Sequence, residues 1–170
     1  MQFPPRGDVS HDNMERPKEL TAVAAVSNAV QCKYAAAILA DLARRRREED
    51  SGIAAGAPFV LVSHNVVECM DAALPASLSP AMHEVLRETL GFDGIVITDD
   101  LAMDAVKQYA NGEAAVLAVL AGNDMLITSD YQNDIPAVLA AVADGRIAER
   151  EIDAHVLRIL RYKQAQGWIE

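Results

Sequence analysis

Three short apolar segments most constrain the fold of this chain: 59–64 (FVLVSH), 95–98 (IVIT) and 125–130 (MLITSD). Short apolar runs rich in β-branched residues and bounded by turn signals are typical of strands buried on both faces. Helical patterns separate the three runs at about 30 residues per repeat, which is the length of a strand-helix unit in a parallel sheet. The sequence therefore predicts an α/β fold in which parallel strands alternate with helices.

Each predicted strand ends in polar residues: Ser63-His64, Thr98-Asp99-Asp100 and Thr128-Ser129-Asp130. Strand ends of this kind lie on one rim of a parallel sheet, where ligands bind. Either aspartate of the pair alone could equally cap the following helix, but two in succession after a buried strand favour a site. His64 is either a ligand in the pocket or a satisfied histidine at the sheet edge, and its place at a strand end favours the pocket.

The paired aspartates suit more than one chemistry. One can act as a carboxylate nucleophile, as in glycosidases in which a second group supplies the proton. Adjacent carboxylates beside a threonine hydroxyl also suit a hard divalent cation. Spacing alone does not choose between these uses. The sequence has no glycine-rich phosphate motif, and neither Ser63 nor Ser129 lies in a nucleophile elbow.

The helix before the central strand has clear boundaries. Ser79 is its predicted N-cap, Pro80 its first residue and Gly91 its C-terminal stop. His83 lies off its apolar stripe, so we expect it on the surface. We expect His155, in the last helix, to have a structural role.

Later helices are signalled less sharply. Asn111-Gly112 predicts a break in the helix that follows the central strand, and 134–136 (DIP) opens the next helix. We expect Leu139 to face inward in that helix, which ends at Gly145. We expect Trp168 to pack back onto the sheet.

The length, composition and charge of the chain argue against several classes of binding partner. A chain of 170 residues, 51% hydrophobic, is long enough for one domain with a real core. Its net charge of −10 argues against nucleic acid or an anionic membrane as a partner. There is no membrane-length apolar run and no signal peptide, and Cys32 and Cys69 lack a metal-binding spacing. We expect a cytoplasmic protein with reduced cysteines.

A resemblance to glycoside hydrolase family 3 says more about the function of this chain than the spacing of its residues does. The stretch 91–103 (GFDGIVITDDLAM) resembles the nucleophile motif of that family, in its β-N-acetylhexosaminidase branch. Further similar segments follow the family order: 61–64 (LVSH), 74–79 (LPASLS), 121–126 (AGNDML) and the C-terminal helix. The resemblance implies a retaining glycosidase that hydrolyses O-glycosyl bonds, takes a small amino-sugar glycoside as substrate and needs no cofactor.

The resemblance also separates the two aspartates. The first of the pair is the family nucleophile, so that role falls on Asp99. Asp100 is then expected to support the site or to cap the next helix. Met103 matches a motif position near the sugar pocket, and with His64 it is the predicted substrate-binding residue.

The N-terminus resembles the family only in part. Residues 2–8 (QFPPRGD) resemble a degraded copy of a Lys-His-Phe-Pro-Gly-His-Gly loop, with Met1 and Gln2 in place of its sugar-binding Lys-His pair. An Asp-x-His pair follows in the family, and its histidine is the general acid/base. Asp12 matches the aspartate of that pair, whereas Met14 stands where the histidine should be and cannot transfer a proton.

The resemblance implies the C-terminal half of a barrel. The family fold is a (β/α)8 TIM barrel, which takes about 250 residues. We therefore expect residues 53–170 to form the C-terminal half of that barrel. We expect residues 1–52 to be a diverged segment, with a loop and an Ala/Arg-rich helix. Activity of this chain alone is expected to be low, unless a partner chain or a homo-oligomer supplies the missing half.

Two alternatives remain open. In the first, the chain is a catalytically inactive remnant or an interaction module. It would then be a small parallel sheet with exposed edges that must be covered. The other alternative is a receiver-like domain whose paired aspartates hold Mg²⁺. It requires a phosphoacceptor aspartate and a lysine at other strand ends, and no lysine directly follows any of the three strands.

Overall fold

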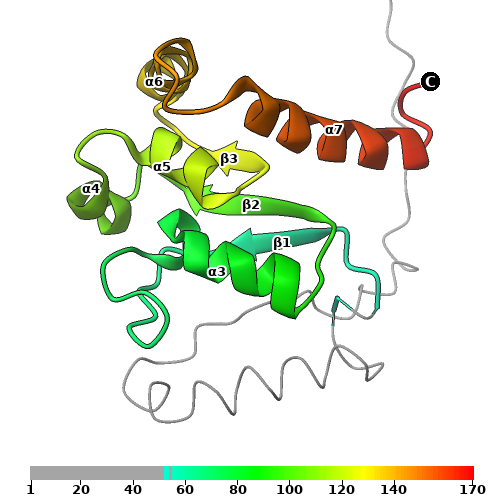
Figure 1. The fold of residues 1–170 in the computed structure, drawn as a ribbon, viewed down its shortest axis with the longest axis horizontal. Coiled ribbons are helices and arrows are strands. Elements are labelled where there is room, and N and C mark those ends of the chain that lie inside the picture. Colours follow the sequence, from blue (N-terminus) through cyan, green and yellow to red (C-terminus); the bar gives the residue numbers. More distant parts are fainter. Residues whose placement is uncertain (1–51, 54) are drawn as a thin grey trace, which may run out of the picture.

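The computed structural model describes residues 52–53 and 55–170, so Asp12 and nearly all of the predicted N-terminal segment lie outside the described residues. Three strands are present in this part of the chain: β1 (Phe59–Val62), β2 (Ile95–Asp100) and β3 (Met125–Ile127) (Figure 1). Helical segments lie between and after them: η1 (Ala76–Leu78), α3 (Pro80–Glu84), η2 (Val85–Thr89), α4 (Asp104–Ala110), α5 (Ala114–Ala121), α6 (Tyr131–Ala143) and α7 (Glu149–Ala165).

The strands form one open parallel sheet in the order β1-β2-β3. Val60 pairs with Val96, and Ile97 pairs with Met125. The register between β2 and β3 shifts before Asp100, which pairs with Ile127. This confirms the predicted alternation of parallel strands and helices for the described residues.

Two strands are shorter than the sequence predicts, and the central one is longer. β1 ends at Val62 and β3 at Ile127, whereas β2 continues to Asp100. The backbone of β1 leaves the sheet after Val62, whose partner is Thr98. The polar residues that follow β1 and β3 therefore lie in loops, where their side chains are free to turn toward one another.

Alternate residues of the sheet face the helices. Val60, Val62 and Val96 are buried in one cluster with apolar residues of α3, η2 and the following turn: Met82, Leu86, Leu90 and Phe92. A second cluster joins η1, α4 and α5, and a third joins α5 and α6. Three buried alanines of α5 let it lie close to its neighbours: Ala114, Ala115 and Ala118.

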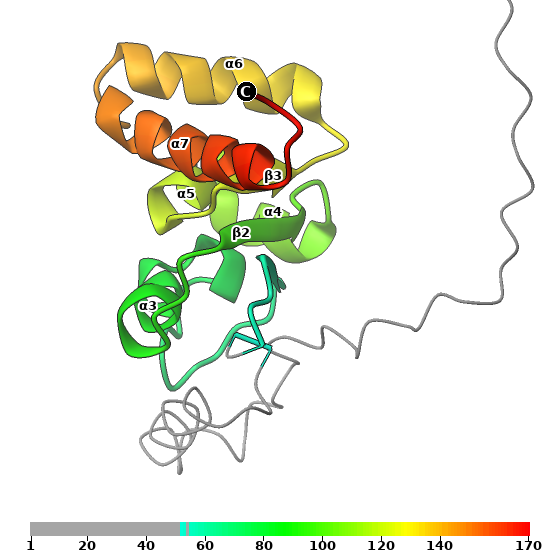
Figure 2. The same cartoon turned by 90° about the vertical axis from the view of Figure 1, so that its right-hand side faces the viewer.

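The opposite face of the sheet is covered only in part by the described residues: Tyr162 of α7 packs against Phe59, and Ile95 is buried, whereas the part nearer the carboxyl ends of the strands is exposed. Successive strand residues point to opposite faces, and Leu61, Met125 and Ile127 are 45%, 37% and 38% exposed. Figure 2 shows α3 and α5 together on one side of the strands. The described part of the chain is therefore a sheet with helices packed on one face and an exposed apolar surface on part of the other.

Local signals placed most helix ends correctly. The Ser79 hydroxyl accepts a hydrogen bond from the Met82 backbone N–H at 3.4 Å, and Pro80 is the first residue of α3. Gly91 has a φ of 61°, which suits the glycine that ends a helix. Asn111 has a φ of 45° and separates α4 from α5, as predicted. α6 is the exception, because it starts at Tyr131 rather than near residue 134.

Two predictions about side-chain burial are wrong. His83 is buried rather than on the surface, because α5 packs against the side of α3 that the apolar stripe leaves out; Gly122, just after α5, lies against its ring. Burial lowers the pKa of His83. Leu139 faces outward from α6 and is 64% exposed, whereas its neighbour Val138 packs in the core.

The C-terminus reaches the sheet indirectly. The rings of Trp168 and Tyr162 meet edge to face with centroids 5.9 Å apart, and Tyr162 meets Phe59 of β1 in the same way at 4.9 Å. Trp168 itself remains mostly exposed.

Candidate functional site at the carboxyl ends of the strands

The polar ends of the three strands meet, as the sequence predicts. His64, after β1, places its Nε2 atom 3.0 Å from the backbone carbonyl oxygen of Asp100 at the end of β2. Ser129, after β3, donates its backbone N–H to Asp100 Oδ1 at 3.1 Å. Asp100 therefore connects all three strand ends.

The Asp100 carboxylate holds the turn that follows β2. Its Oδ1 atom accepts backbone N–H groups from Ala102 at 3.0 Å and from Ser129. These two hydrogen bonds lower the pKa of Asp100 because they stabilise its charged form. Its backbone carbonyl also accepts the N–H of Met103 at 3.1 Å. With these contacts Asp100 is positioned as a support of the loop.

Asp99 is less constrained. It is half-buried, and its Oδ1 atom accepts the backbone N–H of Asp100 at 2.8 Å. Its Oδ2 atom has no hydrogen-bond partner among the described residues. One oxygen is thus anchored, and the other is available to a reacting group.

The predicted substrate-binding residues differ in availability. Met103 is 45% exposed and precedes the first turn of α4. His64 is half-buried and uses both ring nitrogens, since Nδ1 lies 2.6 Å from the Ser77 hydroxyl oxygen. A ligand can therefore meet its ring carbons but not a free ring nitrogen. Asp12, the predicted remnant of the acid/base pair, lies outside the described residues.

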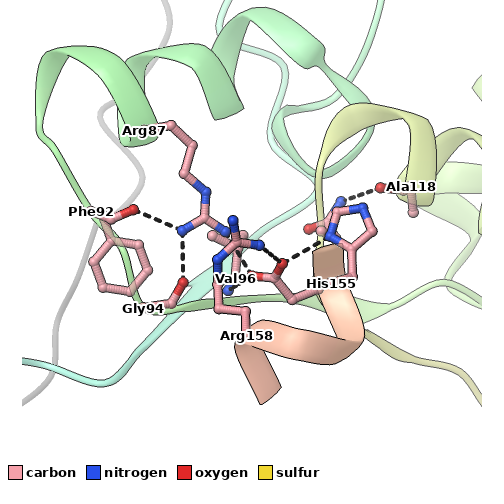
Figure 3. Close-up of polar contacts among 9 residues, drawn as sticks. Arg87, Phe92, Gly94, Val96, Ala118, His155 and Arg158 are labelled. Carbon is pink, nitrogen blue, oxygen red and sulfur yellow. Dashed lines mark hydrogen bonds and ion pairs between the residues drawn. The ribbon is translucent and has the colours of Figure 1, made fainter. Parts of the chain in front are cut away.

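A buried ionic cluster around Asp124 was not predicted. The Asp124 side chain has no solvent exposure, and its Oδ2 atom accepts hydrogen bonds from Arg87 Nη2 at 2.7 Å and from the Val96 backbone N–H at 2.8 Å. Its Oδ1 atom accepts from His155 Nδ1 at 2.9 Å and from Arg158 (Figure 3). Burial alone raises the pKa of Asp124, but these hydrogen bonds and the two guanidinium charges lower it overall.

This cluster connects the elements around the central strand, at whose carboxyl end the candidate site lies. Arg87 also donates to the backbone carbonyls of Phe92 and Gly94, each at 2.7 Å (Figure 3). The cluster therefore ties η2 and α7 to β2, and the structural role predicted for His155 is confirmed. The sequence shows Asp124 only as part of a turn, although an aspartate directly before an apolar strand is a signal that could have marked it.

Other classes of site find no support in this part of the structure. Among the described residues, no group of three or more His, Cys, Asp or Glu side chains is placed to hold a metal ion. No helix in the same region is long and apolar enough to cross a membrane.

Comparison with known sequences decides the family. The pattern of the Glycosyl hydrolase family 3 N terminal domain matches residues 50–162. The chain belongs to glycoside hydrolase family 3. This membership contradicts the receiver-like alternative and agrees with the motifs at 91–103 and 121–126.

Individual relatives point in the same direction. A β-hexosaminidase of Stenotrophomonas maltophilia (strain R551-3) is 42% identical over 120 residues, which are 69% of this chain and 34% of that protein. A β-hexosaminidase of Alkalilimnicola ehrlichii is 31% identical over 145 residues, 84% of this chain and 37% of that protein.

Solved structures give the same family. The family 3 β-N-acetylglucosaminidase from Paenibacillus sp. str. FPU-7 has a TM-score of 0.63 and 41% identity, over 68% of this chain and 23% of that one. A β-N-acetylhexosaminidase from Beutenbergia cavernae has a TM-score of 0.59 and 34% identity, over 66% and 35% of the two chains. The matched part of this chain thus spans between 23% and 37% of the length of these four relatives.

Proposed function

We propose that this chain is the C-terminal half of a family 3 barrel that hydrolyses O-glycosyl bonds of amino-sugar glycosides, in the manner of a β-N-acetylhexosaminidase. Asp99 is its nucleophile, and the chain has low activity on its own. The observation that carries the proposal is the Asp99 carboxylate at the carboxyl end of β2: its Oδ2 atom has no partner among the described residues, while Asp100 holds the turn.

The proposed reaction proceeds in two displacements. The free Asp99 oxygen attacks the anomeric carbon while the bond to the leaving oxygen breaks, and a general acid protonates that oxygen. A water molecule then gives up a proton to the same group, attacks the anomeric carbon and releases Asp99. The configuration at that carbon is retained because it is inverted twice.

The second catalytic group is the weak point of this chain. The resemblance places the general acid/base at Met14, whose thioether cannot carry the proton. General acid/base catalysis contributes about 10²–10⁴-fold, so its loss leaves a slow reaction. This substitution also supports the alternative that the chain is an inactive remnant.

The open sheet supports the proposal of a half-barrel. The uncovered face formed by Leu61, Met125 and Ile127 lies beside the proposed site, at the position of a barrel interior. α6 adds an exposed apolar stripe at helical spacing: Tyr131, Ile135 and Leu139. Further strands, from a partner chain or a second copy, would cover both surfaces.

A chimera tests the function. We would join residues 53–170 of this chain to the part of the Stenotrophomonas maltophilia β-hexosaminidase that precedes its matching region. Hydrolysis of 4-nitrophenyl N-acetyl-β-glucosaminide would then be measured. We expect near-background turnover by the 170-residue chain and clear turnover by the chimera. Asp99→Asn should reduce the turnover of the chimera by about 10⁴-fold or more, as loss of a nucleophile does in other enzymes.

Asp93→Asn is the matched control, because it makes the same change at an exposed position before the other end of β2. It should leave turnover of the chimera unchanged. A chimera that stays active with Asp99→Asn would refute the role of Asp99. A folded but inactive chimera would favour the inactive remnant.

A further inference from the structure

The His64 imidazole bridges two segments on either side of the proposed site. Its Nε2 atom lies 3.0 Å from the Asp100 carbonyl oxygen, and its Nδ1 atom lies 2.6 Å from the Ser77 hydroxyl in η1. We propose that His64 is a positioning residue that fixes the Asp99–Asp100 turn, and that Ser77 holds its ring in the Nε2–H tautomer. This role differs from the sugar-binding role that the sequence suggests.

The two partners determine where the proton lies. A backbone carbonyl can only accept, so His64 Nε2 must carry the hydrogen that is donated to Asp100. In the neutral ring Nδ1 is then an acceptor, and the Ser77 hydroxyl donates to it. Ser77 is completely buried, so its hydroxyl cannot turn to bulk water instead.

Ser77 is itself held rigidly. Its backbone N–H donates to the Ser63 carbonyl at 3.2 Å, and its carbonyl accepts from Asn123 Nδ2 at 2.8 Å. The same Asn123 amide nitrogen donates to the Ala118 carbonyl of α5 at 2.7 Å (Figure 3). The position of the His64 ring is therefore set from β1, η1 and α5 together.

Through Asp100 this network reaches Asp99. The carbonyl of Asp100 is held by His64, its carboxylate is held by two backbone N–H groups, and its own N–H binds Asp99 Oδ1. Without the His64 donor, the Asp100 peptide loses one anchor and the Asp99 carboxylate samples more orientations. The catalytic meaning of this positioning rests on the proposed role of Asp99.

Two isosteric variants separate the two hydrogen bonds. The side-chain amide of His64→Asn reaches the Nδ1 position and keeps a partner for Ser77, whereas that of His64→Gln reaches the Nε2 position and keeps a donor for Asp100. Val116→Ala is the control for general destabilisation, since Val116 is buried in α5 away from this turn. Amide hydrogen exchange at Ala102 and Met103, relative to the amides of α7, reports on the turn.

We expect His64→Asn to speed exchange at Ala102 and Met103 on the order of tenfold relative to α7, the effect of about one hydrogen bond. His64→Gln should restore most of the protection, and Val116→Ala should leave the ratio unchanged. An unchanged ratio in His64→Asn would overturn the proposal.

The tautomer can be measured in the unmodified chain by long-range ¹H–¹⁵N NMR, which does not depend on how any variant folds. We expect the proton on Nε2 in the neutral ring and a mixture of tautomers in Ser77→Ala. A neutral ring protonated on Nδ1 would overturn the proposal. Neither measurement requires turnover, so failure of Asp99 as the nucleophile would leave both results interpretable.

Discussion

At the scale of single residues, the two adjacent aspartates have different surroundings. Asp100 binds two backbone N–H groups through one carboxylate oxygen, whereas Asp99 binds one and keeps its second oxygen free of the described residues. The sequence could predict that the pair lies at a strand end, because a buried apolar run precedes it. It could not predict which hydrogen bonds each aspartate makes, since Ser129 lies far along the chain and meets Asp100 only in the folded sheet.

Asp100→Asn should destabilise the chain in a pH-dependent way. The pKa of Asp100 is lowered on folding, so the folded state binds fewer protons there than the unfolded state. Its stabilising effect is therefore present at pH 7 and is lost as pH falls through the folded-state pKa, below the ordinary value of about 3.9. Thermal melts of both proteins at pH 7 should differ, and the difference should shrink toward about pH 3.

Asp153→Asn, on the exposed surface of α7, reports the general effect of removing one negative charge. A difference between Asp100→Asn and the unmodified chain that stays constant across this pH range would contradict the contacts described for Asp100.

At the scale of elements, capping and turn residues were predicted better than helix faces. Ser79, Gly91 and Asn111 mark boundaries through their own side-chain or backbone chemistry, so a single sequence suffices to locate them. The burial of His83 and the exposure of Leu139 depend on which neighbours cover a helix. The Asp124 cluster was missed for the same reason, because its partners come from η2, β2 and α7.

Asp124→Ala should be severely destabilising. The substitution leaves Arg87 and Arg158 without their buried partner, and breaking a buried ion pair from one side costs about 3–5 kcal/mol of unfolding free energy. Urea denaturation measures the loss. Glu113→Ala is the control, since Glu113 pairs with Arg146 on the exposed surface. It should cost about 1 kcal/mol or less. Equal losses in the two variants would show that Asp124 does not hold the elements together.

Gly94→Ala should disturb the approach to β2. A Cβ atom at this position would lie 2.7 Å from the Pro58 carbonyl oxygen and 2.5 Å from the Phe92 ring. We expect a loss of about 1–3 kcal/mol in unfolding free energy, typical of overpacking. Gly52→Ala, where the nearest atom would be 3.9 Å away, is the control and should be close to neutral in the same urea titration. A neutral Gly94→Ala would contradict the close approach of the Pro58 carbonyl.

At the scale of the whole molecule, part of one sheet face is exposed among the described residues, and the chain spans about a third of its relatives' length, or less. The parallel sheet follows from the spacing of the apolar runs, whereas the strand order β1-β2-β3 is seen only in the folded chain. The proposed half-barrel would need further strands, and their identity could not be predicted from this sequence, because their residues would come from outside the described part. We assign the exposed sheet face to the interior of a barrel only as part of the proposed half-barrel.

The double variant Leu61→Lys with Ile127→Lys should weaken association of the chain with itself or with a complementing half. Both residues lie on the uncovered face, and a charged ammonium there opposes burial. Analytical ultracentrifugation would detect a shift toward monomer with unchanged far-UV circular dichroism. Gln132→Lys adds a charge to an exposed position of α6 and should leave the distribution as it is. An unchanged distribution in the double variant would mean that this face is not an interface.

The most direct test of Asp99 is to trap the glycosyl-enzyme. The chimera would be incubated with a fluorinated N-acetylglucosaminyl donor that forms the covalent intermediate faster than water removes it. Mass spectrometry of the digested protein would then locate the sugar. We predict an ester on the peptide containing residues 91–103, at Asp99, and no label after Asp99→Asn. A sugar attached to Asp100 or to another residue, or turnover with no covalent label, would contradict the proposed role of Asp99.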